Sequence, residues 1–302
     1  METAETKLKY ALEVRNVSQA YDQRVIISGI DLKVRESEFV TIIGPTGCGK
    51  STLLRSILGS EKPAGGTILV GGNVVTEPDR DRGIVFQKYS LFPDKTVKQN
   101  VMFGLELEYY SLSGMAFQKL TFGLYKHNKQ KEFEDRAKDF LDKVGLWEAR
   151  DNYMYELSGG MAQRVAIAQA LIMEPKILLM DEPFGALDAS TREAMQVFIL
   201  NQWKEYRPTI FFVTHDLEEA LFLGTRLVTL SPYYEKVNGM AGSKIVTDIA
   251  LPWMHPRPTS VKSSPEFGQL LQKVRRDGLD PKYLQSIREF DLTHQDAQKI
   301  LY

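Results

Sequence analysis

The sequence predicts an α/β fold in which a parallel-sheet core carries an antiparallel β subdomain and an α-helical subdomain. Three observations predict it. The first ninety residues are rich in short strand-like segments, residues 97–146 repeat apolar side chains at helical spacing, and strand and helix alternate after Arg164. Regular βαβ alternation is typical of a parallel sheet.

The composition is that of an ordinary soluble globule. Of 302 residues, 43% are apolar and 25% are charged, which suffices for one large domain or two small ones. The net charge of −1 gives no global basic field, so nucleic acid is not implied. A single cysteine, Cys48, excludes an intramolecular disulfide and a cysteine-based zinc site and favours a reducing compartment.

The sequence offers no segment that targets or crosses a membrane. The charged opening METAETKLKY lacks the apolar centre of a signal peptide, and nowhere do eighteen apolar residues run together. We therefore expect any membrane role to come through partners.

The N-terminal elements are predicted in order from their patterns. Strands are expected in LEVRNVSQAY, IDLKV and FVTIIG, followed by a helix over Lys50–Leu58, a strand pair in GGTILVGGNVV and a short strand GIVF that ends at Gln87. In the helical middle part, one predicted helix face carries Phe133, Ala137, Phe140, Leu141 and Val144.

After Arg164 the sequence alternates between helix and strand. It reads as helix VAIAQALIM, strand ILLM, a helix over Ala189–Trp203 and strand TIFFVTH. The tail from Leu251 is rich in proline and charge, and an amphipathic helix is expected over Pro265–Leu301.

The loop GPTGCGKST has the pattern G-x-x-x-x-G-K-[ST], follows an apolar strand and precedes a helix. Its glycines let backbone N–H groups surround a phosphate, Lys50 can neutralise β/γ oxygens and Ser51 can ligate Mg²⁺. A glycine-rich turn without a ligand is the alternative. Cys48 is interpreted as a small filler rather than a nucleophile. The candidate nucleotide-binding residues here are Gly44, Pro45, Thr46, Gly47, Cys48, Gly49, Lys50, Ser51 and Thr52.

The run ILLMDEP places two adjacent carboxylates at the carboxyl end of a buried strand, where α/β sheets bind ligands. Asp181 is predicted to hold Mg²⁺, directly or through water. Glu182 is predicted to orient or deprotonate an attacking water. A solvated surface pair is the alternative, which the preceding strand disfavours.

Two further side chains follow predicted strands. His215 comes directly after TIFFVT, so a γ-phosphate contact is favoured over a structural role. Gln87 ends GIVF, and its amide could reach Mg²⁺ or water while linking the sheet to the helical part.

A second phosphate-type turn opens the helix after LSGG. Ser158, Gly159 and Gly160 offer N–H groups at a helix N-terminus, although simple capping by Ser158 is the alternative. The first loop already surrounds the phosphates from one side. Only a second copy of the chain, docked head to tail, lets both loops serve one nucleotide.

In this order, GPTGCGKST, Gln87, LSGGMAQR, ILLMDEP, ALD at 186–188 and His215 resemble the ATPase subunit of an ATP-binding cassette (ABC) transporter, over about Leu12–Pro232. The resemblance implies a P-loop NTPase of ABC type with a RecA-like core. It also implies a homodimer, or a heterodimer with a second ABC subunit, holding two ATP molecules with Mg²⁺ between the Walker A loop of one subunit and the LSGG helix of the other.

The resemblance assigns further residues and boundaries. Tyr21 matches the aromatic residue that stacks on adenine, and Asp188 matches the residue that couples the two sites. Met161 stands where glutamine is commonest, a change also familiar among importers, and Ala162 replaces what is often a charged residue. The implied ATPase domain spans residues 10–250, with a helical subdomain at about 97–165 and a C-terminal extension at 251–302.

The stretch DEPFGALDASTR, with LPW and HPR in the tail, is similar to importers of nitrate, sulfonate, taurine and bicarbonate. This similarity implies transmembrane permease subunits, a solute-binding protein and a peripheral location on the cytoplasmic face of the membrane. The alternatives are importers of other solutes and ABC ATPases of DNA repair or chromosome maintenance. The latter usually carry long coiled coils or zinc-binding cysteines, which this sequence lacks.

Residues 109–131 make the helical part longer than the usual helical subdomain of the family that the sequence resembles, and they contain four lysines, no acidic residue and five aromatic residues. Phe117, Leu120 and Leu124 share a predicted helix face that could dock on a membrane partner or the lipid interface. Packing of an ordinary amphipathic helix on its own subdomain is the alternative.

Overall fold

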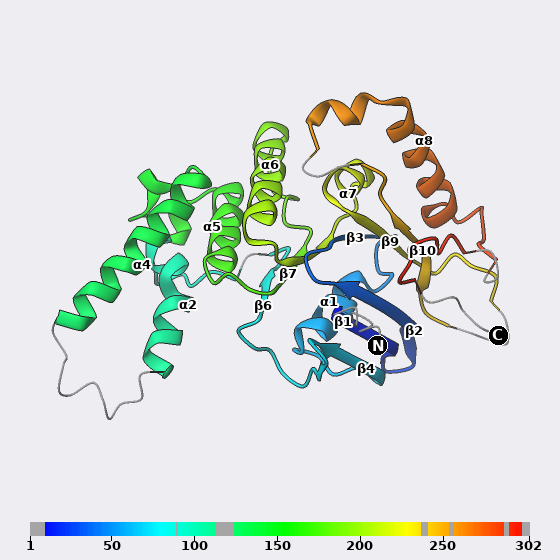
Figure 1. Ribbon diagram of the computed structural model, residues 1–302, viewed down its shortest axis with the longest axis horizontal. Coiled ribbons are helices and arrows are strands. Elements are labelled where there is room, and N and C mark those ends of the chain that lie inside the picture. Colours follow the sequence, from blue (N-terminus) through cyan, green and yellow to red (C-terminus); the bar gives the residue numbers. More distant parts are fainter. Residues whose placement is uncertain are drawn as a thin grey trace, which may run out of the picture.

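The computed structural model describes residues 10–88, 90–112, 124–236, 241–253, 257–286 and 290–297. Its central sheet has the strand order β10-β9-β3-β8-β7-β6 (Figure 1). All neighbouring strands pair in parallel except β10, which is antiparallel to β9. The strands are β3 (Phe39–Ile43), β6 (Arg82–Val85), β7 (Ile177–Asp181), β8 (Thr209–Val213), β9 (Arg226–Ser231) and β10 (Lys244–Ala250).

The sheet is buried on both faces, which explains its continuous apolar runs. Every residue of β3 and of β8 is buried. Phe39 and Phe212 pack into the core shared with most of the helices, whereas Val40 and Val213 pack into the core on the opposite side, which includes the helix over Lys50–Leu58. This alternation follows from the two-residue period of a strand.

A second, antiparallel sheet has the order β2-β1-β4-β5 and covers one face of α1. Strands β1 and β2 form a hairpin in which Tyr21 lies opposite Arg24. Helix α1 (Lys50–Leu58) has the predicted bounds. The strands are β1 (Tyr10–Tyr21), β2 (Arg24–Arg35), β4 (Gly65–Val70) and β5 (Asn73–Val74).

The helical part contains α2 (Val97–Leu112), α4 (Leu124–Lys143) and α5 (Gly159–Leu171), and Figure 1 shows α2 and α4 projecting away from the sheets. The predicted apolar face is confirmed, because its four residues in α4 and Val144, which directly follows the helix, are all buried. Residues 113–123 lie outside the described part, as do the side chains of 110–128, so the predicted Phe117–Leu120–Leu124 face stays a prediction. Among the described helices, none is long and apolar enough to cross a bilayer.

Two further helices, α6 (Ala189–Tyr206) and the short α7 (Leu217–Leu223), pack on the face of the central sheet that carries Phe39 and Phe212. The C-terminal chain then forms α8 (Pro265–Val274) and a single π-helical turn over Arg275–Leu279. The predicted helix over Pro265–Leu301 is therefore wrong beyond this turn. Pro281 follows Asp280 and disfavours helix there, and later residues instead bridge to strands, as Asp291 does to Thr247.

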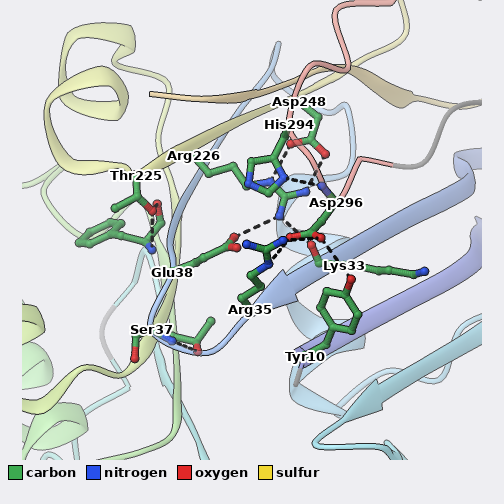
Figure 2. Close-up of polar contacts among 12 residues, drawn as sticks. Tyr10, Lys33, Arg35, Ser37, Glu38, Thr225, Arg226, Asp248, His294 and Asp296 are labelled. Atoms are coloured by element: carbon green, nitrogen blue, oxygen red, sulfur yellow. Dashed lines mark hydrogen bonds and ion pairs between the residues drawn. The ribbon is translucent and has the colours of Figure 1, made fainter. Parts of the chain in front are cut away.

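A buried ionic cluster fastens the end of the described chain to both sheets (Figure 2). Arg226 is 1% exposed, lies 2.7 Å from Asp248 and 3.1 Å from Glu38, and donates to the Lys33 carbonyl. Asp296 accepts from Tyr10 Oη at 3.1 Å and lies 2.6 Å from Arg35.

The ligand atoms of Glu38, His294 and Asp296 are close enough to share a cation. However, Glu38 already pairs with Arg226 and Asp296 with Arg35, and two guanidinium groups beside the carboxylates oppose a metal ion. We therefore interpret the cluster as structural.

Candidate nucleotide-binding site

The loop between β3 and α1 is shaped by its glycines. Gly49 has φ +101 immediately before the helix, and a Cβ there would lie 2.5 Å from Ile27 Cγ2. A Cβ on Gly44 would lie 2.1 Å from the Leu230 carbonyl oxygen. Only glycine fits either position without moving backbone or packed side chains, so the predicted turn is sterically required.

Lys50 points back into this loop from the first turn of α1. Its Nζ donates to the carbonyl oxygens of Gly44 at 2.8 Å and Pro45 at 3.1 Å, and the residue is 7% exposed. A buried ammonium group held by two neutral carbonyls is well placed to meet an incoming anion.

A pocket of about 630 Å³ opens beside the loop. The β1–β2 hairpin and the segments that follow β6, β7 and β8 all contribute to its lining. The lining contains ten predicted residues: Tyr21, Thr46, Gly47, Gly49, Lys50, Ser51, Thr52, Gln87, Glu182 and His215.

Sequence reasoning missed Arg24 and Ile26, which also line the pocket. Both come from the strand that pairs with the Tyr21 segment, so the hairpin turn at 22–23 was the signal that could have identified them. The predicted residues Gly44, Pro45 and Cys48 belong to the loop but do not line the pocket.

Glu182 directly follows β7 and contacts side chains that follow β6 and β8. Its Oε2 accepts from Gln87 Nε2 at 3.2 Å and lies 3.2 Å from His215 Nδ1. Its φ of +47 is left-handed, a strained conformation for a non-glycine residue, and its backbone N donates to the Val213 carbonyl at 2.9 Å. The backbone is thus held so that the carboxylate faces its two partners.

The structure also brings together the predicted Mg²⁺ ligands of α1 and β7. Burial raises the pKa of the Asp181 carboxyl, while a hydrogen bond from Ser51 opposes that rise and the charge of Glu182 adds to it. The Ser51 hydroxyl, the Asp181 carboxylate and the Gln87 amide carry hard oxygen donors of the kind that Mg²⁺ prefers, so the residue types fit this ion.

The burial of Cys48 agrees with its interpretation as a small filler. The thiol is 3% exposed, and burial raises its pKa although the charge of Lys50 opposes this. A buried thiol with a raised pKa is a poor nucleophile.

The second turn lies at the N-terminus of α5 and contributes nothing to the lining of this pocket. Ser158 Oγ accepts from the Met161 N–H at 3.2 Å, so the capping contact exists. A Cβ on Gly159 would meet nothing within 4 Å among the described residues, whereas one on Gly160 would lie 3.3 Å from Leu187. The turn therefore presents an open backbone face at Gly159.

Asp188 also lies outside the pocket lining, at the N-cap of α6. Hydrogen bonds from Thr191 and Ser190 hold the pKa of its carboxyl well below the usual range. These contacts include the N-cap hydrogen bond of α6, so Asp188 caps its own helix here.

Comparison with known proteins identifies the fold and the family. Residues 27–185 match the family model described as "ABC transporter". The chain belongs to the ABC transporter family. This membership confirms the predicted class, an ATPase coupled to transport.

Several relatives resemble this ABC protein over most of its length. A nitrate import ATP-binding protein of Synechocystis is 44% identical over 243 residues, covering 80% of this chain and 84% of the relative. An aliphatic sulfonates import ATP-binding protein of Bacillus cereus is 36% identical, covering 87% and 94%.

Solved structures confirm the cassette fold. A dimeric post-hydrolysis state of an ATP-binding cassette bound to ADP and Pi superposes with a TM-score of 0.66 at 28% identity, covering 80% of this chain and all of that one. The antiparallel sheet, parallel core and helical part therefore belong to an ABC-type P-loop fold.

Proposed function

We propose that this ABC protein is the ATP-hydrolysing subunit of an importer for a small anion such as nitrate, sulfonate, taurine or bicarbonate. Relatives named for nitrate import, bicarbonate transport and aliphatic sulfonates import support the solute class, at 36–44% identity. The observation that carries the ATPase chemistry is the convergence of Gln87 and His215 on one carboxylate oxygen of Glu182 beside the Lys50 loop.

The proposed mechanism divides the site between binding and hydrolysis. Residues 44–52 surround the β-phosphate, Lys50 neutralises β/γ oxygens and Tyr21 stacks on adenine. Ser51, Asp181 and the Gln87 amide would hold Mg²⁺, which would neutralise charge on the phosphates. Glu182 accepts a proton from water or orients that water, and His215 contacts the γ-phosphate.

We propose that each ATP is shared between two copies of the cassette. The open backbone face at Gly159 and its position outside its own chain's pocket support contacts in trans, with Ser158 and Gly160 contributing. The dimeric form of the solved cassette bound to ADP and Pi is consistent with this. We also propose that Asp188, at the N-cap of α6, couples the two sites.

The domain boundaries, the location and the partners of the protein belong to the same proposal. Residues 10–250 form the ATPase domain, with the helical subdomain at about 97–165, and residues 251–302 form an extension. The protein works at the cytoplasmic face of the membrane, bound to transmembrane permease subunits that receive solute from a binding protein. Its partner cassette is a second copy or another ABC subunit.

Complementation between two inactive variants tests the shared site. Ser158→Arg blocks the turn, and Lys50→Ala disables the loop, so each homodimer has two damaged sites. Mixing them creates heterodimers in which one composite site has both an intact loop and an intact turn. We expect ATPase activity to reappear after subunit exchange. A mixture as inactive as its components contradicts the shared site.

Isolation from native membranes tests the transport role. We expect permease subunits to co-purify, and nitrate, bicarbonate or sulfonates, supplied with the solute-binding protein, to stimulate the assembled ATPase. Stimulation by a sugar or amino acid would contradict the anion proposal. Co-purification with soluble proteins and stimulation by DNA would contradict the importer itself.

A further inference from the structure

The loop that carries His215 is fixed by the short helix that follows it. Helix α7 begins at Leu217, and its N-cap Asp216 accepts from the Glu219 N–H at 3.1 Å. The Asp216 N–H in turn donates to Thr214 Oγ1 at 3.0 Å. His215 therefore lies between two residues whose positions depend on the first turn of α7.

A buried carboxylate inside α7 extends this connection. Glu219 is 4% exposed, and its Oε2 accepts the Thr214 hydroxyl at 2.6 Å. Its Oε1 accepts from Gln196 Nε2 of α6 at 3.0 Å. Glu219 thus fixes the residue before His215 relative to α6, although it does not line the nucleotide pocket.

The C-terminal extension holds the other end of α7. Arg257 is 5% exposed, and its guanidinium donates to the carbonyl oxygens of Leu221 and Gly224. These carbonyls lie at the helix end, where intrahelical donors run out. The guanidinium also stacks on the Trp253 ring at 4.9 Å, and burial lowers its pKa to about 10.

A second cation of the extension contacts the first turns of α7 and the same glutamine. Lys262 Nζ lies 3.2 Å from Glu218 Oε1 and 3.4 Å from Gln196 Oε1, and 4.7 Å from the Phe222 ring centre. Gln196 therefore receives Lys262 on its oxygen and holds Glu219 with its nitrogen. This is a continuous polar path from the extension to Thr214.

Apolar packing adds to these polar contacts. Phe267 and Val274 of α8, 1% and 2% exposed, share a core with Leu217 and Leu221 of α7. In Figure 1 the orange segment of the extension arches over α7 before it continues as α8. The extension thus contacts α7 at both ends and along its outer face.

We propose that the C-terminal extension positions His215 against Glu182 by clamping α7, with Arg257 and Lys262 as its clamps and Glu219 as the link to Thr214. None of these three residues lines the nucleotide pocket, so they are positioning residues. The inference deepens the proposed function and rests on the role of His215 given there. A small tilt of α7 would lengthen the 3.2 Å contact between His215 and Glu182.

The test uses the full-length protein and compares Arg257→Met with Arg257→Lys, across a protein concentration series that covers dimerisation. Methionine keeps apolar bulk but removes the donors, whereas lysine keeps a charged donor. We expect Arg257→Met to lower kcat for ATP hydrolysis by about tenfold or more with little change in KM, because small displacements of a reacting group cost rate rather than binding. Arg257→Lys should restore part of the loss.

The matched control is Lys273→Met, which removes another cation of the extension whose ion pair runs to Asp291 instead of α7. It should leave kcat unchanged. In a His215→Ala background, adding Arg257→Met should cost little further rate, because both act through His215.

The outcomes separate this inference from the proposed function. An unchanged kcat for Arg257→Met, with only a lower unfolding temperature, would overturn the clamp while leaving the ATPase assignment intact. Full additivity of the two variants would also overturn it. Near-normal hydrolysis by His215→Ala alone would instead overturn the role of His215 in the proposed function.

Discussion

Replacing Glu182 with glutamine separates the positioning of water from the acceptance of its proton. An amide oxygen can still accept from Gln87 and His215, which now contact Oε2 at 3.2 Å each, so the wall of the pocket should keep its shape. The amide cannot take a proton. Loss of a general base lowers rates by about 10²–10⁴-fold, or roughly 3–5 kcal/mol in the barrier.

The assay is steady-state release of phosphate, combined with equilibrium binding of ATP. We expect kcat to fall within this range while ATP affinity changes little, because Lys50 and its loop are untouched. Glu174→Gln is the control. Glu174 has the same left-handed backbone (φ +48) but pairs with Arg136, outside the pocket. A Glu182→Gln protein that keeps more than about one-tenth of its turnover would refute the reasoning.

Three further predictions follow from buried polar groups. Cys48 should react with iodoacetamide far more slowly in the folded protein than in urea, even without ATP, because burial covers the thiol and raises its pKa; equal rates would contradict its placement. Arg226→Met should lower the free energy of unfolding by about 3–5 kcal/mol in urea titrations, because it leaves the buried carboxylate of Asp248 without its ion-pair partner. Adding Asp248→Leu should recover most of that loss. Burial raises the pKa of the Glu219 carboxyl, despite hydrogen bonds that oppose it, so its stabilisation is complete below the unfolded pKa and is lost as pH rises through the folded value. Glu219→Gln should therefore gain stability relative to the wild type as the pH rises above about 4.5, the ordinary pKa of a glutamate, and parallel pH profiles would contradict this.

The parts of the fold that the sequence could predict are those governed by local pattern. The α1 bounds, the buried face of α4 and the apolar strands β3, β7 and β8 follow from periodicity and from the glycines of the loop. The pocket residues that follow the strands could be predicted from the sequence as well. Parallel strands end at one edge of a sheet, which brings Gln87, Glu182 and His215 together although 128 positions separate the first from the last (215 − 87).

The rest depends on contacts that local pattern does not encode. The end of helix α8 reflects Pro281 and the pairing of later residues with strands, which compete with an amphipathic pattern that continues past them. The role of Arg257 was hidden because an arginine in a proline-rich tail is usually solvated, whereas here it finds helix carbonyls 33 and 36 residues away in sequence. The place of Arg24 in the pocket lining depends on the register of the β1–β2 hairpin, in which it lies opposite Tyr21.

The position of β3 in the central sheet has a consequence during synthesis. Both of its neighbours, β8 and β9, lie about 170 to 190 residues further along the chain, at Thr209–Val213 and Arg226–Ser231. Until the ribosome has released them, the apolar FVTII strand has two unpaired edges, the condition that favours aggregation of nascent chains. The strand that ends at the phosphate-binding loop is thus synthesised early but finds its pairing strands late. We expect ribosome-bound chains that end before β8 to need a chaperone.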